Sequence, residues 1–179
     1  MYNFDKIRFV VYLEPELSYL AATKGDIDYF YIAKPDWWAR DLPKVPAVEK
    51  GWLVRQKIYN DAPQGTRGIA LNQRSEPLKD VRVRKALQFL FNREQMIRTL
   101  GFNEMRPLDS YFQAGEYQNP DNEKIRYNPK KAFALLNEAG YTDRGNDGVL
   151  VKNEQRLSIT VTYYAPEIEK YLTSYQEDC

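Results

Sequence analysis

The sequence contains no histidine, and this absence restricts its chemistry more than any other feature. Its 179 residues include 26 Lys and Arg and 25 Asp and Glu, but His is missing altogether. Histidine is the usual general base near neutral pH and the commonest metal ligand in proteins. We therefore predict no Ser-His-Asp or Cys-His catalytic site, no metal site and no cofactor.

Cysteine and long apolar runs are also scarce. The single cysteine is Cys179, the last residue, so the sequence predicts neither an internal disulfide nor a cysteine metal cluster. The longest aliphatic and aromatic run, Phe9 to Leu13, has five residues, far fewer than a membrane-spanning helix needs. No signal-peptide pattern opens the sequence.

The composition is that of an ordinary globular protein. Hydrophobic residues make up 43% of the chain and charged residues 28%, and the formal net charge is +1. Such a balance gives no electrostatic preference for nucleic acid or for an anionic membrane. The length corresponds to one domain or to parts of two.

The first part of the sequence predicts a strand-helix-strand unit. Residues 7–13 and 27–33 are rich in β-branched and aromatic side chains, and both runs are expected to be strands buried on two faces. Between them, Leu17, Leu20 and Ala21 have helical spacing. Residues 52–59 alternate as a further strand. Asp36 is expected to cap a short helix that carries Trp37 and Trp38.

The central part of the sequence predicts three helices. Asp80 is an N-cap residue for a helix whose core face is expected to carry Val83, Ala86, Leu87, Leu90 and Phe91. Asn92 and Gln95 have the spacing of a capping box for a second helix, which ends before Gly101. Asn128 and Pro129 start the third, which Gly140 ends.

Strands and loops are expected around these helices. Residues 61–65 have turn chemistry, residues 66–72 and 157–163 are expected to be strands, and residues 102–127 form a long loop. Residues 166–179 are expected to be helical, with Ile168, Leu172 and Tyr175 on one face. The chain begins directly with strand-like sequence and stops without a helix end signal. We therefore expect a segment of a longer protein with an α/β fold.

Two segments carry a family resemblance. PLKDVRVRKALQFLFNREQMI at residues 77–97 and YNPKKAFALLNEAGY at residues 127–141 resemble family 5 of the extracellular solute-binding proteins. The order and spacing of the segments also resemble the family, with KGDID at residues 24–28 in the strand-helix-strand unit. DSYF at 109–112 and YLTSYQED at 171–178 resemble the branch that imports oligopeptides and peptide-like microcins.

The resemblance implies a function and a fold. Members are the dipeptide-, oligopeptide- and nickel-binding components of ABC importers, so a peptide or other small solute and ABC permease subunits are the expected partners. The expected fold is α/β, of the type II periplasmic-binding-protein class. Residues 1–64 resemble part of the first lobe and residues 65–179 most of one half of the second. The implied location is the periplasm or the outer face of the cell membrane, and the implied activity is binding, not catalysis.

Candidate ligand-binding residues follow from the same resemblance. Gly65, Thr66 and Arg67 are expected to border the cleft, because the turn before them coincides with a crossover between the lobes. Gly65 suits a hinge, and Arg67 could offer its guanidinium to a ligand carboxylate. Candidate cleft-lining aromatic residues, for which internal packing is the favoured interpretation, are Trp37, Trp38, Tyr111 and Phe112. The acidic partner of a peptide's α-amino group is expected beyond Cys179.

Two other functional classes remain open at the level of sequence. A carboxylate-dependent hydrolase is one alternative, with Glu14, Glu16, Asp26 and Asp28 as its acidic residues. A nucleic-acid-binding module is the other, although the balanced charge argues against it. Its basic residues would be Arg82, Arg84, Lys85, Arg93 and Arg98. For Arg82 and Arg84 the favoured interpretation is a solvated or ion-paired structural role on the polar face of a helix.

Overall fold

The computed structural model describes residues 3–59, 65–112 and 116–179. The chain divides into two compact units, Met1–Tyr59 and Asn60–Cys179, and each is described by itself. The predicted turn at 61–65 lies outside the described residues except for Gly65. The predicted lobe boundary between residues 64 and 65 therefore stays a prediction.

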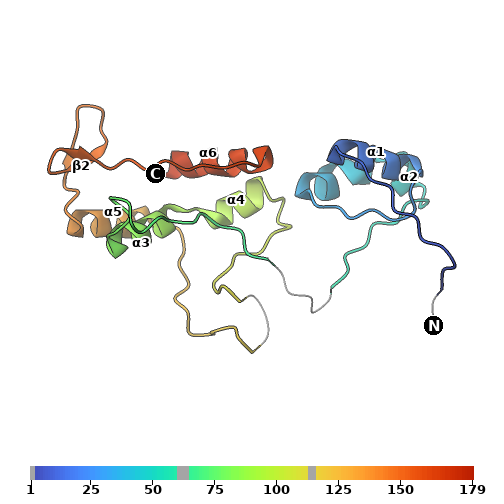
Figure 1. The fold of residues 1–179 in the computed structure, drawn as a ribbon, viewed down its shortest axis with the longest axis horizontal. Helices are drawn as coiled ribbons and strands as arrows, with labels where there is room; N and C mark the ends of the chain where they lie inside the picture. The colour runs from blue at the N-terminus through green and yellow to red at the C-terminus, as the bar shows by residue number, and fades with distance from the viewer. Residues whose placement is uncertain (1–2, 60–64, 113–115) are drawn as a thin grey trace. The chain divides into compact units, whose positions relative to one another are not determined.

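The first unit is built from one regular helix and several short helical turns (Figure 1). Helix α1, Pro15–Lys24, begins at a proline and ends at Gly25, whose φ of 84° is accessible to glycine without strain. The Asp36 carboxylate accepts a hydrogen bond from the Trp37 amide, as the sequence predicts. The short elements are the π-helix η1 Trp37–Asp41, the 3-10 helix η2 Leu42–Lys44 and helix α2 Pro46–Glu49.

The second unit contains most of the regular structure (Figure 1). Helices α3 and α4 are separated by two residues, and α5 follows the long loop. A small antiparallel sheet of order β1-β2-β3 comes next, in which Asp143 pairs with Val151 and Val151 with Arg156. The elements are α3 Val81–Leu90, α4 Arg93–Thr99, α5 Pro129–Glu138, β1 Asp143–Arg144, β2 Leu150–Lys152, β3 Gln155–Arg156, η3 Pro166–Ile168 and α6 Glu169–Asp178.

The predicted helix caps of the second unit are confirmed. The Asp80 carboxylate accepts from the Arg82 amide, and the Asn128 side chain accepts from the Lys131 amide. Asn92 and Gln95 form a capping box: the Gln95 amide donates to Asn92 Oδ1, and Asn92 Nδ2 donates to Gln95 Oε1. Local side-chain chemistry therefore sets where these helices begin.

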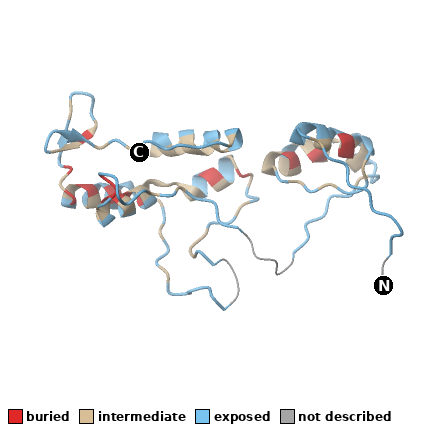
Figure 2. Cartoon of the chain, viewed as in Figure 1, coloured by how far each residue is buried: buried red, intermediate tan, exposed pale blue. Residues whose placement is uncertain are grey.

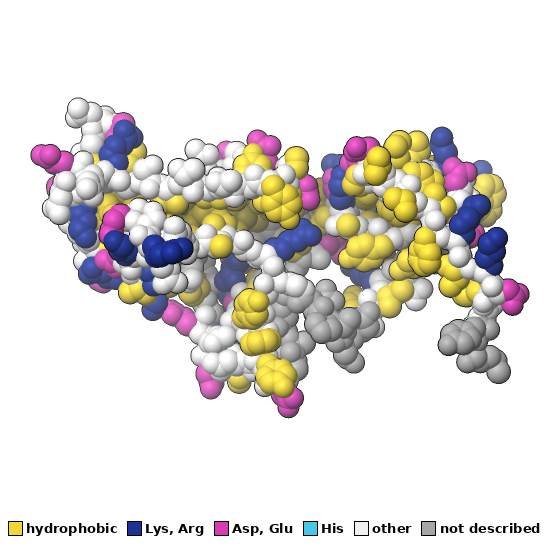
Figure 3. Space-filling model, viewed as in Figure 1, with side chains coloured by type: hydrophobic (Ala, Val, Ile, Leu, Met, Phe, Trp, Pro, Cys, Tyr) yellow, Lys and Arg dark blue, Asp and Glu magenta, His cyan; other side chains and the backbone are white. Residues whose placement is uncertain are grey.

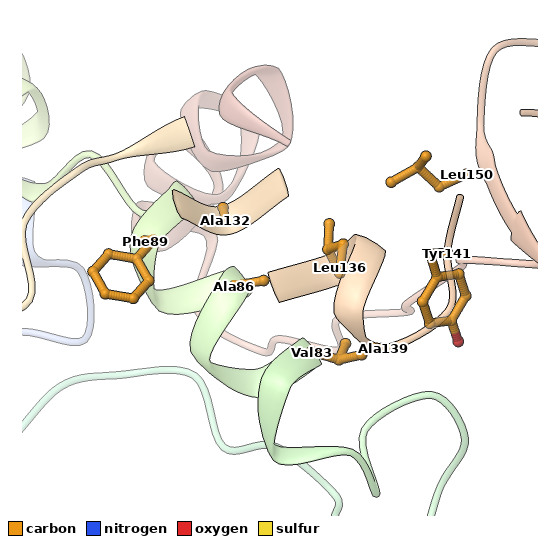
Figure 4. Packing of buried hydrophobic residues seen from close by; sticks show 8 residues of the cluster. All are labelled: Val83, Ala86, Phe89, Ala132, Leu136, Ala139, Tyr141 and Leu150. Atoms are coloured by element: carbon orange, nitrogen blue, oxygen red, sulfur yellow. The ribbon is translucent and has the colours of Figure 1, made fainter. Parts of the chain in front are cut away.

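The core of the second unit lies between α3 and α5. Val83 and Ala86 of α3 face Leu136 and Ala139 at the end of α5 (Figure 4). Val83, Ala86 and Ala132 are completely buried, and Figure 2 shows buried positions on both helices. Small alanine side chains let the two helices approach closely, so the contact depends on close packing.

The predicted core face of α3 is only partly correct. Val83 and Ala86 are buried as expected, but Leu87, Leu90 and Phe91 are only half-buried. Phe89 is buried instead, with the Lys131 ammonium 4.3 Å from the centre of its ring. The packing direction is set by α5, and the spacing of apolar residues along α3 alone does not reveal where α5 lies.

Helix α6 packs on α3 and α4 through its tyrosines. The Tyr175 hydroxyl donates to the Leu87 carbonyl at 2.8 Å, and the Tyr171 hydroxyl donates to the Leu100 carbonyl at 3.4 Å. The Phe91 and Tyr175 rings meet edge to face at 4.8 Å. Ile168, Leu172 and Tyr175 are all half-buried. The predicted apolar face is therefore confirmed.

The strand predictions are wrong, because the predicted runs do not form regular β-structure in the described part of the chain. In the described part of the chain, no residue of 7–13, 27–33, 52–59, 66–72 or 157–163 belongs to a β-ladder, and Figure 1 draws these runs without arrows. A strand needs a second strand to accept and donate its backbone hydrogen bonds. The side chains of these runs favour a strand, but the sequence alone does not show whether a second strand is available to pair with each run. None of the helices in the described segments is long and apolar enough to cross a membrane.

We predict that Val83→Ala lowers the free energy of unfolding of the second unit by about 2 kcal/mol, because it opens a cavity between α3 and α5. The matched control is Val81→Ala on the same helix. Val81 is half exposed, so its truncation is expected to change stability by less than about 0.5 kcal/mol. Urea unfolding followed by circular dichroism measures both variants, and equal effects would contradict this packing.

Candidate ligand-binding site

Trp37 is the centre of an aromatic cluster inside the first unit. Its ring stacks on Tyr19 with 4.5 Å between centroids, and Phe30 lies 6.3 Å away. The Lys34 ammonium lies 4.6 Å from the same ring and forms an ion pair with Glu16. Because Trp37 is buried by these contacts, its role within this unit is packing, and a role in a ligand cleft stays a prediction.

Trp38 has a different environment from its neighbour. Its half-buried ring has the Arg55 guanidinium at 5.2 Å and the Lys57 ammonium at 5.5 Å. Arg55 also donates a hydrogen bond to the Trp38 carbonyl at 2.8 Å. Cations above an indole face are held by its quadrupole. Sequence analysis did not detect this group, because Arg55 and Lys57 lie 17 and 19 positions along the chain.

Gly65, Thr66 and Arg67 are exposed and belong to neither a helix nor a ladder. A Cβ at Gly65 would meet no atom within 4 Å among the described residues. Local crowding therefore does not require glycine here. The structure places the three residues together on an accessible segment, and their contact with a ligand stays a prediction.

Tyr111 and Phe112 belong to an exposed aromatic group on the loop between α4 and α5. Their rings meet edge to face at 5.4 Å, and Tyr117 lies 5.9 Å from Phe112. All three side chains are more than half exposed. Exposed aromatic rings that contact one another can bind apolar or planar groups of a ligand.

Three charged residues hold this loop, and sequence analysis missed them as a group. The Arg126 guanidinium donates to both carboxylate oxygens of Asp109 at 2.8 and 3.0 Å. The Arg93 guanidinium, on α4, donates to the Leu108 and Ile125 carbonyls. These contacts join residues 108–109 to residues 125–126, on either side of the aromatic group. The Arg126 hydrogen bonds, aided by the charge of Arg93, hold the pKa of Asp109 below its ordinary value.

The arginines of the DVRVR segment bind protein atoms. Arg82 donates to both oxygens of Asp80 and to the Glu138 carbonyl at the end of α5. Arg84 donates to the Leu78 and Lys79 carbonyls at 2.7 and 2.8 Å. The predicted structural role of both arginines is confirmed. Since Arg93 also binds backbone carbonyls, three of the five basic residues proposed for nucleic acid are engaged within the chain.

Four carboxylates are held in their ionised form by basic partners. The pKa values of Glu16, Asp41, Asp80 and Asp109 are all lowered, in each case first by a hydrogen bond from a basic side chain. A general acid near neutral pH needs a raised pKa. Among the described residues, no three acidic or cysteine side chains are grouped as metal ligands.

Comparison with protein families gives one match over almost the whole chain. The family described as Bacterial extracellular solute-binding proteins, family 5 Middle, matches residues 2–178. The chain belongs to this family. The resemblance found in the DVRVR and NEAGY segments is therefore confirmed.

Relatives of this family 5 chain include proteins named for peptides and for nickel. It is 24% identical to the probable peptide-binding protein YejA of Agrobacterium fabrum, over 99% of this chain and 34% of that protein. It is 28% identical to the oligopeptide-binding protein AppA of Bacillus subtilis, over 88% of this chain and 28% of that protein. It is 29% identical to the nickel-binding periplasmic protein of Escherichia coli, over 88% of this chain and 29% of that protein.

A solved relative shows the same fold. The crystal structure of NikA from Brucella suis in complex with Fe(III)-EDTA is similar with a TM-score of 0.71 and 28% identity. The similarity covers 92% of this chain and 33% of that one. The predicted α/β fold, part of the type II periplasmic-binding-protein class, is confirmed. The chain spans about a third of the length of the relatives it matches.

The Asp80–Arg82 contact predicts an acid-sensitive fold. Hydrogen bonds from Arg82 lower the Asp80 pKa from 3.8 to about 2. Because the pKa is lower in the folded state, the ionised carboxylate stabilises the fold above about pH 4, and the contribution is lost as the pH falls toward 2. We expect it to be about 1 to 2 kcal/mol. Asp80→Asn keeps a helix cap but removes this titration, so its stability should vary less over that range in urea unfolding. A parallel pH profile for both proteins would contradict the assignment.

The loop contacts give a second prediction. Arg93→Lys replaces a planar fork by a single ammonium that cannot reach two carbonyls together. Amide exchange in residues 102–112 and 116–127 should become about tenfold faster, while α3 is unchanged. Arg98→Lys, on the exposed face of the same helix, is the control and should exchange like the parent. Unchanged exchange in the Arg93 variant would show that the loop is held by other contacts.

Proposed function

We propose that this chain is part of the substrate-binding component of an ABC importer that captures peptides or peptide-like solutes between two lobes. The observation that carries the proposal is the family 5 match over residues 2–178. Similarity to peptide-binding relatives of two bacterial groups supports peptides as the ligand class. Nickel or a metal chelate is the second ligand class, supported by the nickel-binding periplasmic protein of Escherichia coli and by the NikA structure with Fe(III)-EDTA.

Peptide capture is consistent with the accessible groups of the chain. In this proposal, Gly65, Thr66 and Arg67 border the cleft, where an edge of backbone can bind an extended peptide with little dependence on its side chains. The exposed rings of Tyr111 and Phe112 offer apolar contact on their own loop. Both groups lie in the second unit.

The proposal also covers activity, partners and location. Binding without catalysis is supported by relatives that are named as binding proteins. The partners would be a peptide and the permease subunits of the importer. A periplasmic or extracellular location is supported by a relative named as periplasmic.

A comparison of peptide ends tests the role of Arg67. In a polypeptide that carries this chain within a complete family 5 fold, Arg67→Ala should weaken binding of free-acid peptides about tenfold and of amidated peptides much less, because one charged hydrogen bond is lost. Arg74→Ala, a second exposed arginine of the same segment, is the control. Calorimetric titration measures all three proteins. An equal loss of affinity for both kinds of peptide would show that Arg67 does not bind the ligand carboxylate.

Gly65 can be tested in the same polypeptide. Gly65→Pro fixes φ and removes the amide donor, so lobe closure and peptide affinity should both decrease. Gly65→Ala is the matched control, because the described structure has room for a Cβ. Small-angle scattering with and without peptide reports closure. A proline variant that closes and binds like the parent would place the hinge elsewhere.

A further inference from the structure

Two clusters of three aromatic rings occur in the described part of the chain, and they differ in exposure. One is the buried cluster around Trp37. The other, which we call the loop cluster, consists of Tyr111, Phe112 and Tyr117 on the loop between α4 and α5. Its members are 76%, 52% and 72% exposed. Internal packing therefore does not account for the contacts between these three rings.

The buried cluster shows what aromatic rings bind elsewhere in this chain. The Lys34 ammonium lies 4.6 Å from the centre of the Trp37 ring and forms an ion pair with Glu16. Trp38 and Trp52 likewise have a basic side chain 5.2 and 4.7 Å from their ring centres. The negative face of an aromatic ring attracts each of these cations. Rings combined with a carboxylate thus hold an ammonium group within the chain itself.

The loop cluster has suitable rings but no cation of the chain. Among the segments that the structure describes, no lysine or arginine makes a cation–π contact with Tyr111, Phe112 or Tyr117. The first two ring planes are 84° apart, and the second and third are 46° apart. Rings at large angles to one another form the walls of the aromatic cages that bind alkylammonium groups.

The charge of the loop favours the same kind of ligand. Residues 102–127 include five acidic and three basic side chains, a formal net charge of −2, whereas the whole chain has a net charge of +1. Glu116, next to Tyr117 in the sequence, is exposed and forms no ion pair within the described residues. Figure 3 shows hydrophobic and acidic side chains together on the surface of this loop. A cation is attracted both by the rings and by this charge.

The loop is also fixed before any ligand arrives. Arg126 joins Asp109 through two hydrogen bonds, and Arg93 binds the Leu108 and Ile125 carbonyls. The Asn122 side chain donates a further hydrogen bond to the Asp109 carbonyl at 3.1 Å. These contacts lie on both sides of the loop cluster. Binding to a loop that is already ordered costs less conformational entropy.

We propose that the loop cluster binds the ammonium or guanidinium group of a basic side chain, so that the captured solutes include peptides that contain lysine or arginine. The cation lies over the faces of Tyr111, Phe112 and Tyr117, as Lys34 lies over Trp37. Glu116 supplies the opposite charge. Recognition of a cation rests on this loop alone, and only the peptide that carries the cation rests on the proposed function.

An uncharged apolar side chain is the other occupant that three exposed rings accept. Such a side chain gains contact area, but it is not attracted by the ring quadrupoles or by Glu116. Norleucine has the straight alkyl chain of lysine without its ammonium group. A pair of peptides that differ only in lysine and norleucine therefore separates the two interpretations.

Nuclear magnetic resonance of this chain with labelled tyrosine and phenylalanine rings tests the proposal. The probe is N-acetyl-Ala-Lys-Ala-amide, whose blocked ends exclude binding through a terminal charge. Analogues carry norleucine, glutamate or trimethyllysine in place of lysine. The ring signals of Tyr111, Phe112 and Tyr117 should titrate with the lysine and trimethyllysine peptides at concentrations about tenfold lower than with the norleucine peptide. The glutamate peptide should not shift them.

Variants of two loop residues identify the groups responsible. Tyr117→Leu removes a ring but keeps an apolar side chain, and Glu116→Gln removes the charge but keeps the shape. Each should reduce the preference for lysine over norleucine at least about threefold. Tyr117→Phe keeps the ring face and should retain the preference. Tyr164→Leu, at a tyrosine that is 96% exposed on another segment, is the control and should behave like the parent.

Three results would overturn the proposal. The first is a lysine peptide that leaves the ring signals of the loop cluster unshifted. The second is an equal midpoint for the lysine and norleucine peptides, which would assign the rings to apolar contact. The third is an unchanged preference for lysine in Tyr117→Leu or in Glu116→Gln.

A second measurement separates this inference from the proposed function. In a polypeptide that carries this chain within a complete family 5 fold, calorimetric titration compares peptides with free ends that contain lysine or norleucine. The lysine peptides should bind about tenfold more tightly. Binding of both kinds with equal affinity would overturn this inference and leave the proposed function standing. Binding of neither, with a preference for lysine still present at the loop cluster, would contradict the proposed function alone.

Discussion

The close contact between α3 and α5 is the constraint on which the second unit depends. Val83, Ala86 and Ala132 are fully buried in this contact. Arg82 reinforces the contact, because it joins the Asp80 cap of α3 to the last turn of α5. The Asn128 amide also donates to the Phe89 carbonyl at 2.8 Å. Packing and hydrogen bonds thus fix the same pair of helices at both ends.

That pair of helices supports the elements that present candidate ligand-binding groups. Helix α4 follows α3 after two residues, and its Arg93 binds the Leu108 and Ile125 carbonyls of the long loop. The loop in turn exposes Tyr111 and Phe112. Arg82 and Arg84 of α3 likewise bind backbone carbonyls within the chain.

The first unit is organised by aromatic contacts. Tyr19, Phe30 and Trp37 come from α1, from an unpaired run and from η1, and their rings meet within 6.4 Å. This small cluster covers one face of the run around Phe30 but not the other.

The sequence by itself determined α1, α3, α4, α5 and α6, the caps at which α3, α4 and α5 begin, and the family. Asp80, Asn92 and Asn128 cap helices through contacts within three residues, and such local interactions can be read from spacing. Only the tertiary structure decided which face of α3 is buried, that Arg93 and Arg126 hold the long loop, and that Trp37 packs while Trp38 lies beside two cations. These features depend on residues far apart in the chain. The strand predictions failed for the same physical reason: a ladder requires a second strand, and no local pattern shows whether that strand is present.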